Sequence, residues 1–184
     1  MREDTLSNSE LDRIYKHLIS PSHKRFFSIL RYTGAKIYRV CELKIGDVYD
    51  DCLNPLDCIS FGSASDQILK VPIVPRLNLT LLRYRPKIID SKAWLFPSIR
   101  KGEHIKMSSA DKFFRAALYK AELDSKGISL NMIRRSFIYE LYSHGVSFSI
   151  IQELTGLKTV QTYKRDFVKD PINLQDALTK IFEY

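Results

Sequence analysis

Two adjacent arginines, Arg134 and Arg135, are the residues of this sequence best suited to chemistry. They lie in the stretch 129–167, where apolar residues recur at the spacing of an amphipathic helix and Tyr163 follows in a short basic tail. A guanidinium group presents a rigid fork of N–H donors that fits the oxygens of a phosphate. The stretch therefore predicts a phosphate clamp, and the alternative is a solvated or salt-bridged pair of charges on a helix face.

The overall charge favours a polyanionic partner, nucleic acid first. The chain has 184 residues, with 29 lysines and arginines against 21 acidic residues, and a net charge of +8. Such an excess attracts phosphate backbones, although a merely basic surface is the alternative. The length suits one domain with a hydrophobic core, and we expect residues 1–184 to form a single domain.

Metal sites, disulfides and membrane spans are not indicated by the sequence. The 3 cysteines form no C-x-x-C pair, and the 4 histidines are scattered without metal-ligand spacing. No apolar run is long enough to cross a membrane, and the polar N-terminal residues do not form a secretory signal. We expect no metal, no cofactor, no membrane partner, and a cytoplasmic, intracellular location that is nucleoid-associated if the source is prokaryotic.

Local signals predict two helices in the first part of the chain and a hairpin after them. Ser7 and Glu10 form a capping box at one helix start, Pro21 suits the first turn of the next helix, and Gly34 is a C-terminal stop. Between residues 49 and 75, two short β-rich segments predict a hairpin in which Pro72 marks an edge strand.

The second part of the chain is predicted to be helical. A helix is expected over 77–84, and another over 108–123 with Ser108 and Asp111 as its cap. The arginine-bearing helix should start near Ser129 or Asn131. The expected inward-facing residues of that helix and of the next, which ends at Gly156, are Ile133, Phe137, Leu141, Ile150, Ile151 and Leu154. A short amphipathic helix is predicted over 174–182.

Five segments in order resemble the catalytic domain of the tyrosine recombinases, or phage integrases. TGAKIYRVCELKIGDV is similar to the family's first box, and the hairpin that ends in KVPIV is similar to its lysine-bearing hairpin. WLFPS matches a family turn, NMIRRSF resembles the box His-x-x-Arg, and IIQELTGLKTVQTY resembles the box that ends in the nucleophilic tyrosine. The resemblance covers residues 6–168 and implies an α+β fold, mostly helical with a small antiparallel β-sheet.

The resemblance also implies a chemistry. In the family, a tyrosine oxygen attacks a DNA phosphate to give a 3′-phosphotyrosine, two arginines stabilise the charge on the phosphate, and a lysine and a histidine-class residue handle protons without a metal. Arg134 falls at the position of the second arginine. Asn131 stands where the family has histidine or lysine, and Leu157 replaces the histidine or tryptophan that follows the glycine. The hairpin lysine position falls near 66–67, and Lys70 is the nearby basic residue.

Two positions depend on the alignment register. An ungapped count places Lys36 at the first arginine, whereas the local string around Arg39 places that residue there; we favour Lys36, because its register needs no deletion. The usual spacing places Asp166 at the nucleophile, and Tyr163 lies three residues early. Tyr163 could act only if the tail is shortened or rewound by about one helical turn.

These departures lead to three hypotheses. The first is a catalytically impaired integrase domain, without the family's N-terminal core-binding domain, that contacts double-stranded DNA. The second is an active recombinase with Arg39 and Arg134 as clamp, Lys70 as acid and Tyr163 as nucleophile. The third is a protein-interaction module, and the C-terminal helix could bind a second copy or another recombinase. The expected DNA contacts are Lys36, Arg39, Asn131, Arg134, Arg135, Lys158, Lys164 and Arg165.

Overall fold

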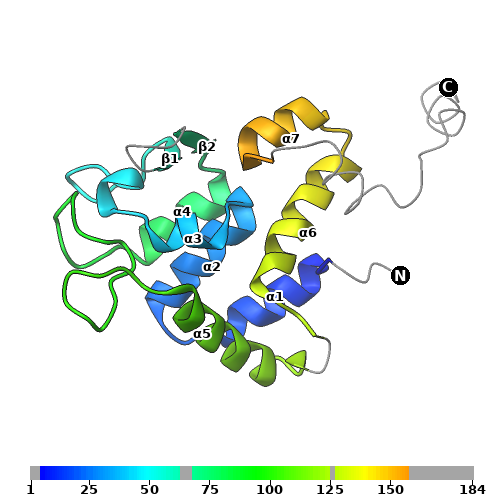
Figure 1. Ribbon diagram of the computed structural model, residues 1–184, viewed down its shortest axis with the longest axis horizontal. Coiled ribbons are helices and arrows are strands. Elements are labelled where there is room, and N and C mark those ends of the chain that lie inside the picture. Colours follow the sequence, from blue (N-terminus) through cyan, green and yellow to red (C-terminus); the bar gives the residue numbers. More distant parts are fainter. Residues whose placement is uncertain (1–4, 63–67, 125–126, 158–184) are drawn as a thin grey trace, which may run out of the picture.

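The computed structural model describes residues 5–62, 68–124 and 127–157, and within them it is mostly helical (Figure 1). The described helices are α1 (Asn8–His17), α2 (Pro21–Thr33), α3 (Ile37–Cys41), the 3-10 turn η1 (Ile45–Asp47), α4 (Pro75–Arg83), α5 (Met107–Lys120), α6 (Leu130–Ser143) and α7 (Phe148–Thr155). Together with one two-stranded antiparallel sheet, they confirm the predicted α+β fold.

The sheet is the hairpin that the sequence predicted. Strand β1 (Cys58–Phe61) pairs with β2 (Leu69–Pro72), with Ile59 opposite Val71 and Ser60 opposite Lys70. Pro72 is the last residue of its strand, where the missing N–H of proline does the least harm to the ladder. The inward-facing residues Ile59 and Val71 join the core, so the hairpin is anchored by one face.

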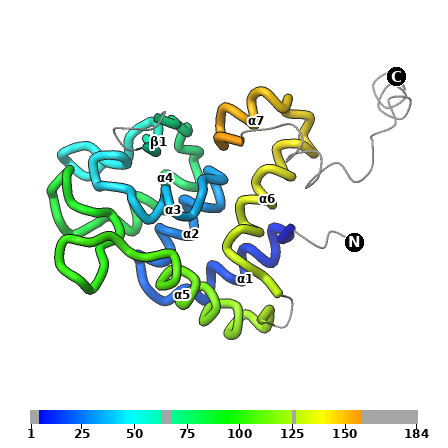
Figure 2. The backbone as a smooth tube through the Cα atoms, in the orientation of Figure 1, coloured from blue at the N-terminus to red at the C-terminus, as the bar shows by residue number. Residues whose placement is uncertain are grey.

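Helix α2 runs through the middle of the molecule (Figure 2). Phe26, Phe27, Ile29 and Leu30 are all buried around it, and the helix packs against α3, α4 and α6. Since 8 of its 13 residues are buried, polar ones among them, other elements cover the helix on most of its sides. The helix begins at Pro21 and ends at Gly34, which adopts the left-handed conformation, as the sequence predicted.

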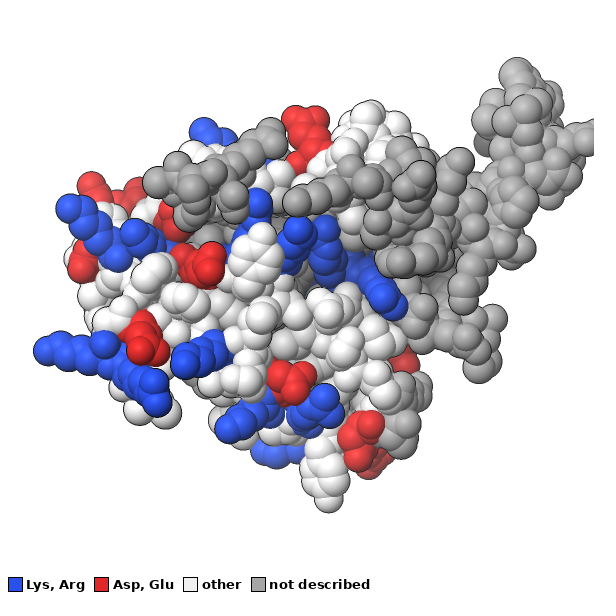
Figure 3. Space-filling view, viewed as in Figure 1, with Lys and Arg blue, Asp and Glu red and all other residues white. Residues whose placement is uncertain are grey.

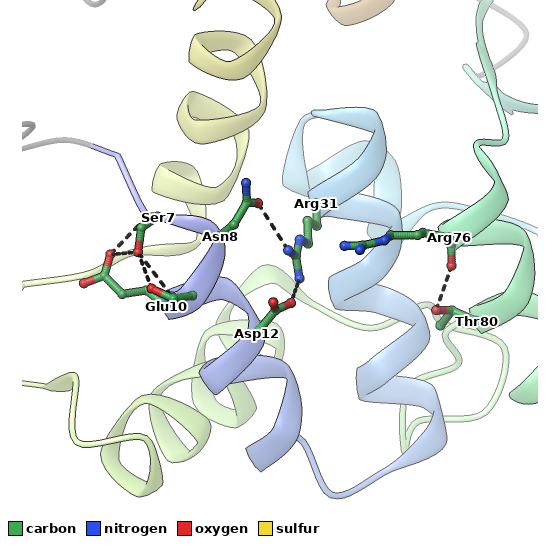
Figure 4. Close-up of polar contacts among 8 residues, drawn as sticks. Ser7, Asn8, Glu10, Asp12, Arg31, Arg76 and Thr80 are labelled. Carbon is green, nitrogen blue, oxygen red and sulfur yellow. Dashed lines mark hydrogen bonds and ion pairs between the residues drawn. The ribbon is translucent and has the colours of Figure 1, made fainter.

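Helix α1 is fixed to this centre by polar contacts. Arg31 on α2, which is buried, donates from Nη1 to Oδ1 of Asp12 at 2.6 Å and from Nη2 to Oδ1 of Asn8 at 3.3 Å (Figure 4). The predicted capping box of Ser7 and Glu10 is present at the start of α1. Arg31 is therefore a structural arginine, occupied by its own fold.

A second structural arginine, Arg25, holds the segment that follows α4. Its Nη1 donates to the carbonyl oxygen of Tyr84 and its Nη2 to that of Leu95 at 3.3 Å. The guanidinium lies 5.6 Å from the ring centroid of Phe96, and burial lowers its pKa. Arg25 was not predicted to be structural, because nothing in the local sequence distinguishes a buried arginine from an exposed one.

The predicted cap of α5 is wrong. The helix was expected to start at Ser108, but it starts at Met107 with Lys106 at the N-cap, and no side chain caps it. The Asp111 carboxylate instead accepts from Nε of Arg115 at 2.6 Å, one turn further along. The helix also ends three residues early, because Glu122 adopts a positive φ of 55° that no helix can accommodate.

The buried faces of α6 and α7 also differ from the prediction. Ile133 is buried, but Phe137 and Leu141 are only partly buried, and Ile138 is fully buried in their place. The first half of α6 packs on α2 and its second half packs on α7, so its buried face turns along the helix. Ile150, expected to face inward, is 49% exposed, whereas its neighbour Ile151 is buried.

Gly34 is the point at which α6 approaches the end of α2. Its φ is +59°, and a methyl group added there would lie 2.3 Å from Cδ1 of Phe137. We expect Gly34→Ala to lower the free energy of unfolding by roughly 2–4 kcal/mol, through left-handed backbone strain and the clash with Phe137. Urea unfolding measures this change.

Gly145→Ala is the matched control, because Gly145 also follows a helix end with a positive φ of 76° but has open space around it. It should cost only the backbone strain of about 1–2 kcal/mol. Equal losses in the two variants would show that the contact between Gly34 and Phe137 is not tight.

Candidate functional site

A cleft of about 830 Å³ lies between α3, the hairpin and α7. Lys36, Tyr38 and Arg39 come from α3 and its N-cap, whereas Leu69 and Lys70 come from β2. The remaining lining residues are Ile68, Ser149, Gln152, Glu153, Gly156 and Leu157. Figure 3 shows basic side chains gathered near the centre of this face, between the regions of the hairpin and of α6.

Arg134 ties together the elements around this cleft. From α6, its Nη1 donates to the carbonyl oxygen of Gly34, and Nη1 and Nη2 both donate to the carbonyl oxygen of Thr155 at 3.1 Å. Gly34 caps the C-terminus of α2, and Thr155 is the last residue of α7. Carbonyl groups at helix ends lack intrahelical partners and carry partial negative charge, so they attract a guanidinium.

The same bonds determine which part of Arg134 is left for a ligand. They occupy both N–H groups of Nη1 and one of Nη2. No described residue accepts a hydrogen bond from Nε or from the second N–H group of Nη2. Such an Nε–Nη2 edge is suited to a bidentate contact with two phosphate oxygens. Arg134 is thus already oriented, since its backbone contacts hold the other edge.

The electrostatics of Arg134 link it to α3. Burial, and to a lesser extent the nearby charge of Arg39, lower its pKa to about 10, whereas Tyr38 acts in the opposite direction. At neutral pH the guanidinium therefore remains charged. The effect of Arg39 on the pKa of Arg134 shows that the two guanidinium groups lie within electrostatic reach of each other.

Arg39 is held by weaker contacts than Arg134. Its Nε donates to the hydroxyl of Tyr38 at 3.3 Å, and its Nη1 donates to the carbonyl oxygen of Phe61 in β1 at 3.4 Å. Lys36 lies one turn before it, with Nζ 5.9 Å from the ring centroid of Tyr38. Lys70 is exposed on the neighbouring strand. Both residues considered for the first arginine position thus line one cleft.

The predicted site residues are partly brought together. Lys36, Arg39 and Lys70 line the cleft. Arg134 does not line it, but its guanidinium donates to the carbonyl oxygen of Thr155, the residue before the lining residue Gly156. Arg135 is half-buried on α6. Asn131 does not line the cleft: it borders a separate hollow of about 270 Å³ at the start of α5 and α6. The predicted residues that lie outside the described part of the chain are Tyr163, Lys158, Lys164, Arg165, Asp166 and the helix over 174–182.

Several cleft residues were missed by the sequence analysis. Tyr38, Ser149, Gln152 and Glu153 all line the cleft. Tyr38 could have been identified by its place directly before Arg39. The three α7 residues could have been identified because they lie in or beside the segment IIQELTGLKTVQTY. Glu153 brings a negative charge to a mainly basic cleft, so its side of the cleft is the less favourable one for a phosphate.

The part of the chain that the structure describes contains neither a cluster of metal-binding side chains nor a membrane-spanning helix. No group of three or more histidine, cysteine, aspartate or glutamate side chains could hold a metal ion there. No helix in the same ranges is long and apolar enough to cross a membrane.

The known proteins that this chain resembles belong to one family. Residues 4–169 match the model of the phage integrase family. A tyrosine recombinase XerA of Pyrococcus horikoshii is 25% identical over 179 residues, which cover 96% of this chain and 60% of that protein. The chain spans between 40% and 60% of the length of the four curated relatives it matches.

Solved structures share the fold. The XerH site-specific recombinase bound to its difH substrate has a TM-score of 0.73 and 20% identity, over 96% of this chain and 54% of that chain. The catalytic domain of bacteriophage HP1 integrase has a TM-score of 0.68 and 20% identity, over 95% of this chain and 93% of that domain.

The bonds of Arg134 predict a stability effect. Arg134→Ala should lower the free energy of unfolding by roughly 1–3 kcal/mol, because the carbonyls of Gly34 and Thr155 lose their partner. Arg115→Ala is the control, since it removes only an exposed ion pair on α5 and should cost about 0.5 kcal/mol or less. If urea unfolding gives the same loss for both, Arg134 does not hold the helix ends.

Proposed function

Because the chain belongs to the phage integrase family, we propose that it binds double-stranded DNA through the phosphate backbone and is impaired in cutting it. The observation that supports this proposal is the cleft itself. Lys36, Arg39 and Lys70 reach it from two separate segments, and Arg134 is held beside it with an Nε–Nη2 edge to which no described residue binds. Phosphate contacts of this kind supply most of the non-specific affinity for DNA.

The assignment of individual roles follows from the contacts. Arg134 acts as the oriented clamp, because its position is set by two helix ends. Arg39 acts as the second clamp, because it is the cleft residue whose charge affects Arg134. Lys36 and Lys70 add point charges without a fork, so they strengthen attraction more than orientation.

The proposed impairment rests on the groups that transfer protons and attack phosphorus. Leu157 lines the cleft at the position where the family has histidine or tryptophan, so an apolar side chain replaces a donor. Asn131 borders another hollow. In the usual spacing, Asp166 takes the place of the nucleophile, and a carboxylate cannot form a phosphotyrosine.

An active recombinase is the competing proposal. It is favoured by one observation, the presence of two arginines and Lys70 around the same cleft, which are the charged parts of the reaction. In that case Tyr163 supplies the nucleophile and Lys70 protonates the leaving oxygen. The two proposals share DNA binding and differ only in covalent chemistry.

DNA binding is tested by gel shift with a random duplex over a salt series. The wild type should bind with micromolar affinity that falls steeply with salt. Arg39→Gln should weaken binding roughly 10-fold, and it should reduce the slope of log affinity against log salt concentration by the equivalent of about one phosphate contact. Lys120→Gln is the charge-matched control, because it removes one positive charge at the exposed end of α5, away from the cleft. Equal weakening by both variants, or no binding at low salt, would contradict the proposal.

Cleavage is tested with a nicked suicide duplex that traps phosphotyrosine. We expect no covalent protein–DNA species with the wild type, because the proton donors of the reaction are replaced. A species that forms with the wild type and disappears in Tyr163→Phe would establish the active recombinase and overturn the impairment, while leaving DNA binding intact.

A further inference from the structure

Tyr38 lies among the cations of the cleft. It lines the cleft between Lys36 and Arg39, with the ammonium of Lys36 5.9 Å from its ring centroid and its hydroxyl 3.3 Å from Nε of Arg39. The ring is exposed, so packing alone does not explain its position. A tyrosine offers such neighbours both a π face and an oxygen acceptor.

Tyr38 also limits how Arg39 can turn. The guanidinium is bound at two corners, Nε by Tyr38 and Nη1 by the carbonyl oxygen of Phe61. The guanidinium is planar, so two bonds at Nε and Nη1 fix the orientation of its plane. They thereby also fix the direction in which Nη2 points. Without the hydroxyl, Arg39 would keep a single backbone contact and could rotate away from a ligand.

We propose that Tyr38 is a positioning residue of the phosphate site, whose hydroxyl orients Arg39 toward the DNA backbone. This inference rests on the proposed DNA binding. Its role differs from that of a DNA contact, since Tyr38 acts through Arg39. The effect of removing the hydroxyl should therefore exist only while Arg39 is present.

A double-mutant cycle with the full chain tests this dependence. Binding of a fluorescent random duplex is measured for the wild type, Tyr38→Phe, Arg39→Gln and the double variant. Tyr38→Phe should weaken binding roughly 5-fold in the wild-type background and have no effect in the Arg39→Gln background. Arg39→Lys gives a second background, in which the charge is kept but Nε is lost, and Tyr38→Phe should again have no effect.

The outcomes separate the two proposals. Equal weakening by Tyr38→Phe in all three backgrounds, or no weakening in any, overturns the positioning role while DNA binding stands. Failure of the wild type to bind the duplex overturns the proposed function and this inference together. Thermal unfolding checks the variants, because Tyr38→Phe removes one exposed hydroxyl and should leave the melting temperature unchanged.

Discussion

The contact of Arg134 with two helix ends is the constraint on which this architecture depends. Most of the core lies around α2, but Ile138 and Ile151 form a smaller cluster between α6 and α7. Where α6 passes the end of α2, the guanidinium joins the last carbonyls of α2 and α7. The hydrogen bonds thus position α7, which forms one wall of the cleft. The same side chain keeps its charge despite burial, so one residue combines a structural contact with a donor edge to which no described residue binds.

Four arginines of the described chain fall into two groups according to what their donors bind. Arg25 and Arg31 are buried and bind carbonyls or carboxylates of their own fold, which leaves their charge little role at the surface. Arg39 and Arg134 are half-buried beside the cleft and are only partly occupied. Type and spacing in the sequence do not separate these groups, because the carbonyls that occupy a buried arginine are distant in the chain.

Local signals in the sequence predicted much of the fold. The capping box of Ser7, the first-turn Pro21 and the left-handed glycines Gly34 and Gly156 all lie where the patterns indicated, since each acts on its own helix end. The predictions that failed did so because contacts of the folded chain overrode the local signal. Asp111 bonds to Arg115 instead of capping, and the buried face of α6 turns because two different partners cover its two halves.

The site was predictable in part for similar reasons. The segments that resemble family motifs indicated Arg134, Lys36, Arg39 and Lys70. Such motifs mark residues that lie together in the folded domain even when they are far apart in the sequence. Asn131 was assigned to the same site because it stands where the family has histidine or lysine. It lines another hollow, since its side chain is short and lies one turn away, whereas the long arginine reaches Thr155.

The proposed function requires DNA phosphates to bind at the cleft formed by α3, the hairpin and α7. The most direct measurement is nuclear magnetic resonance of the arginine Nε–H groups during titration with a random duplex. The signals of Arg39 and Arg134 should shift and return at high salt, while those of Arg25 and Arg31 stay in place. Shifts confined to arginines outside the cleft, such as Arg100 and Arg115, would contradict it.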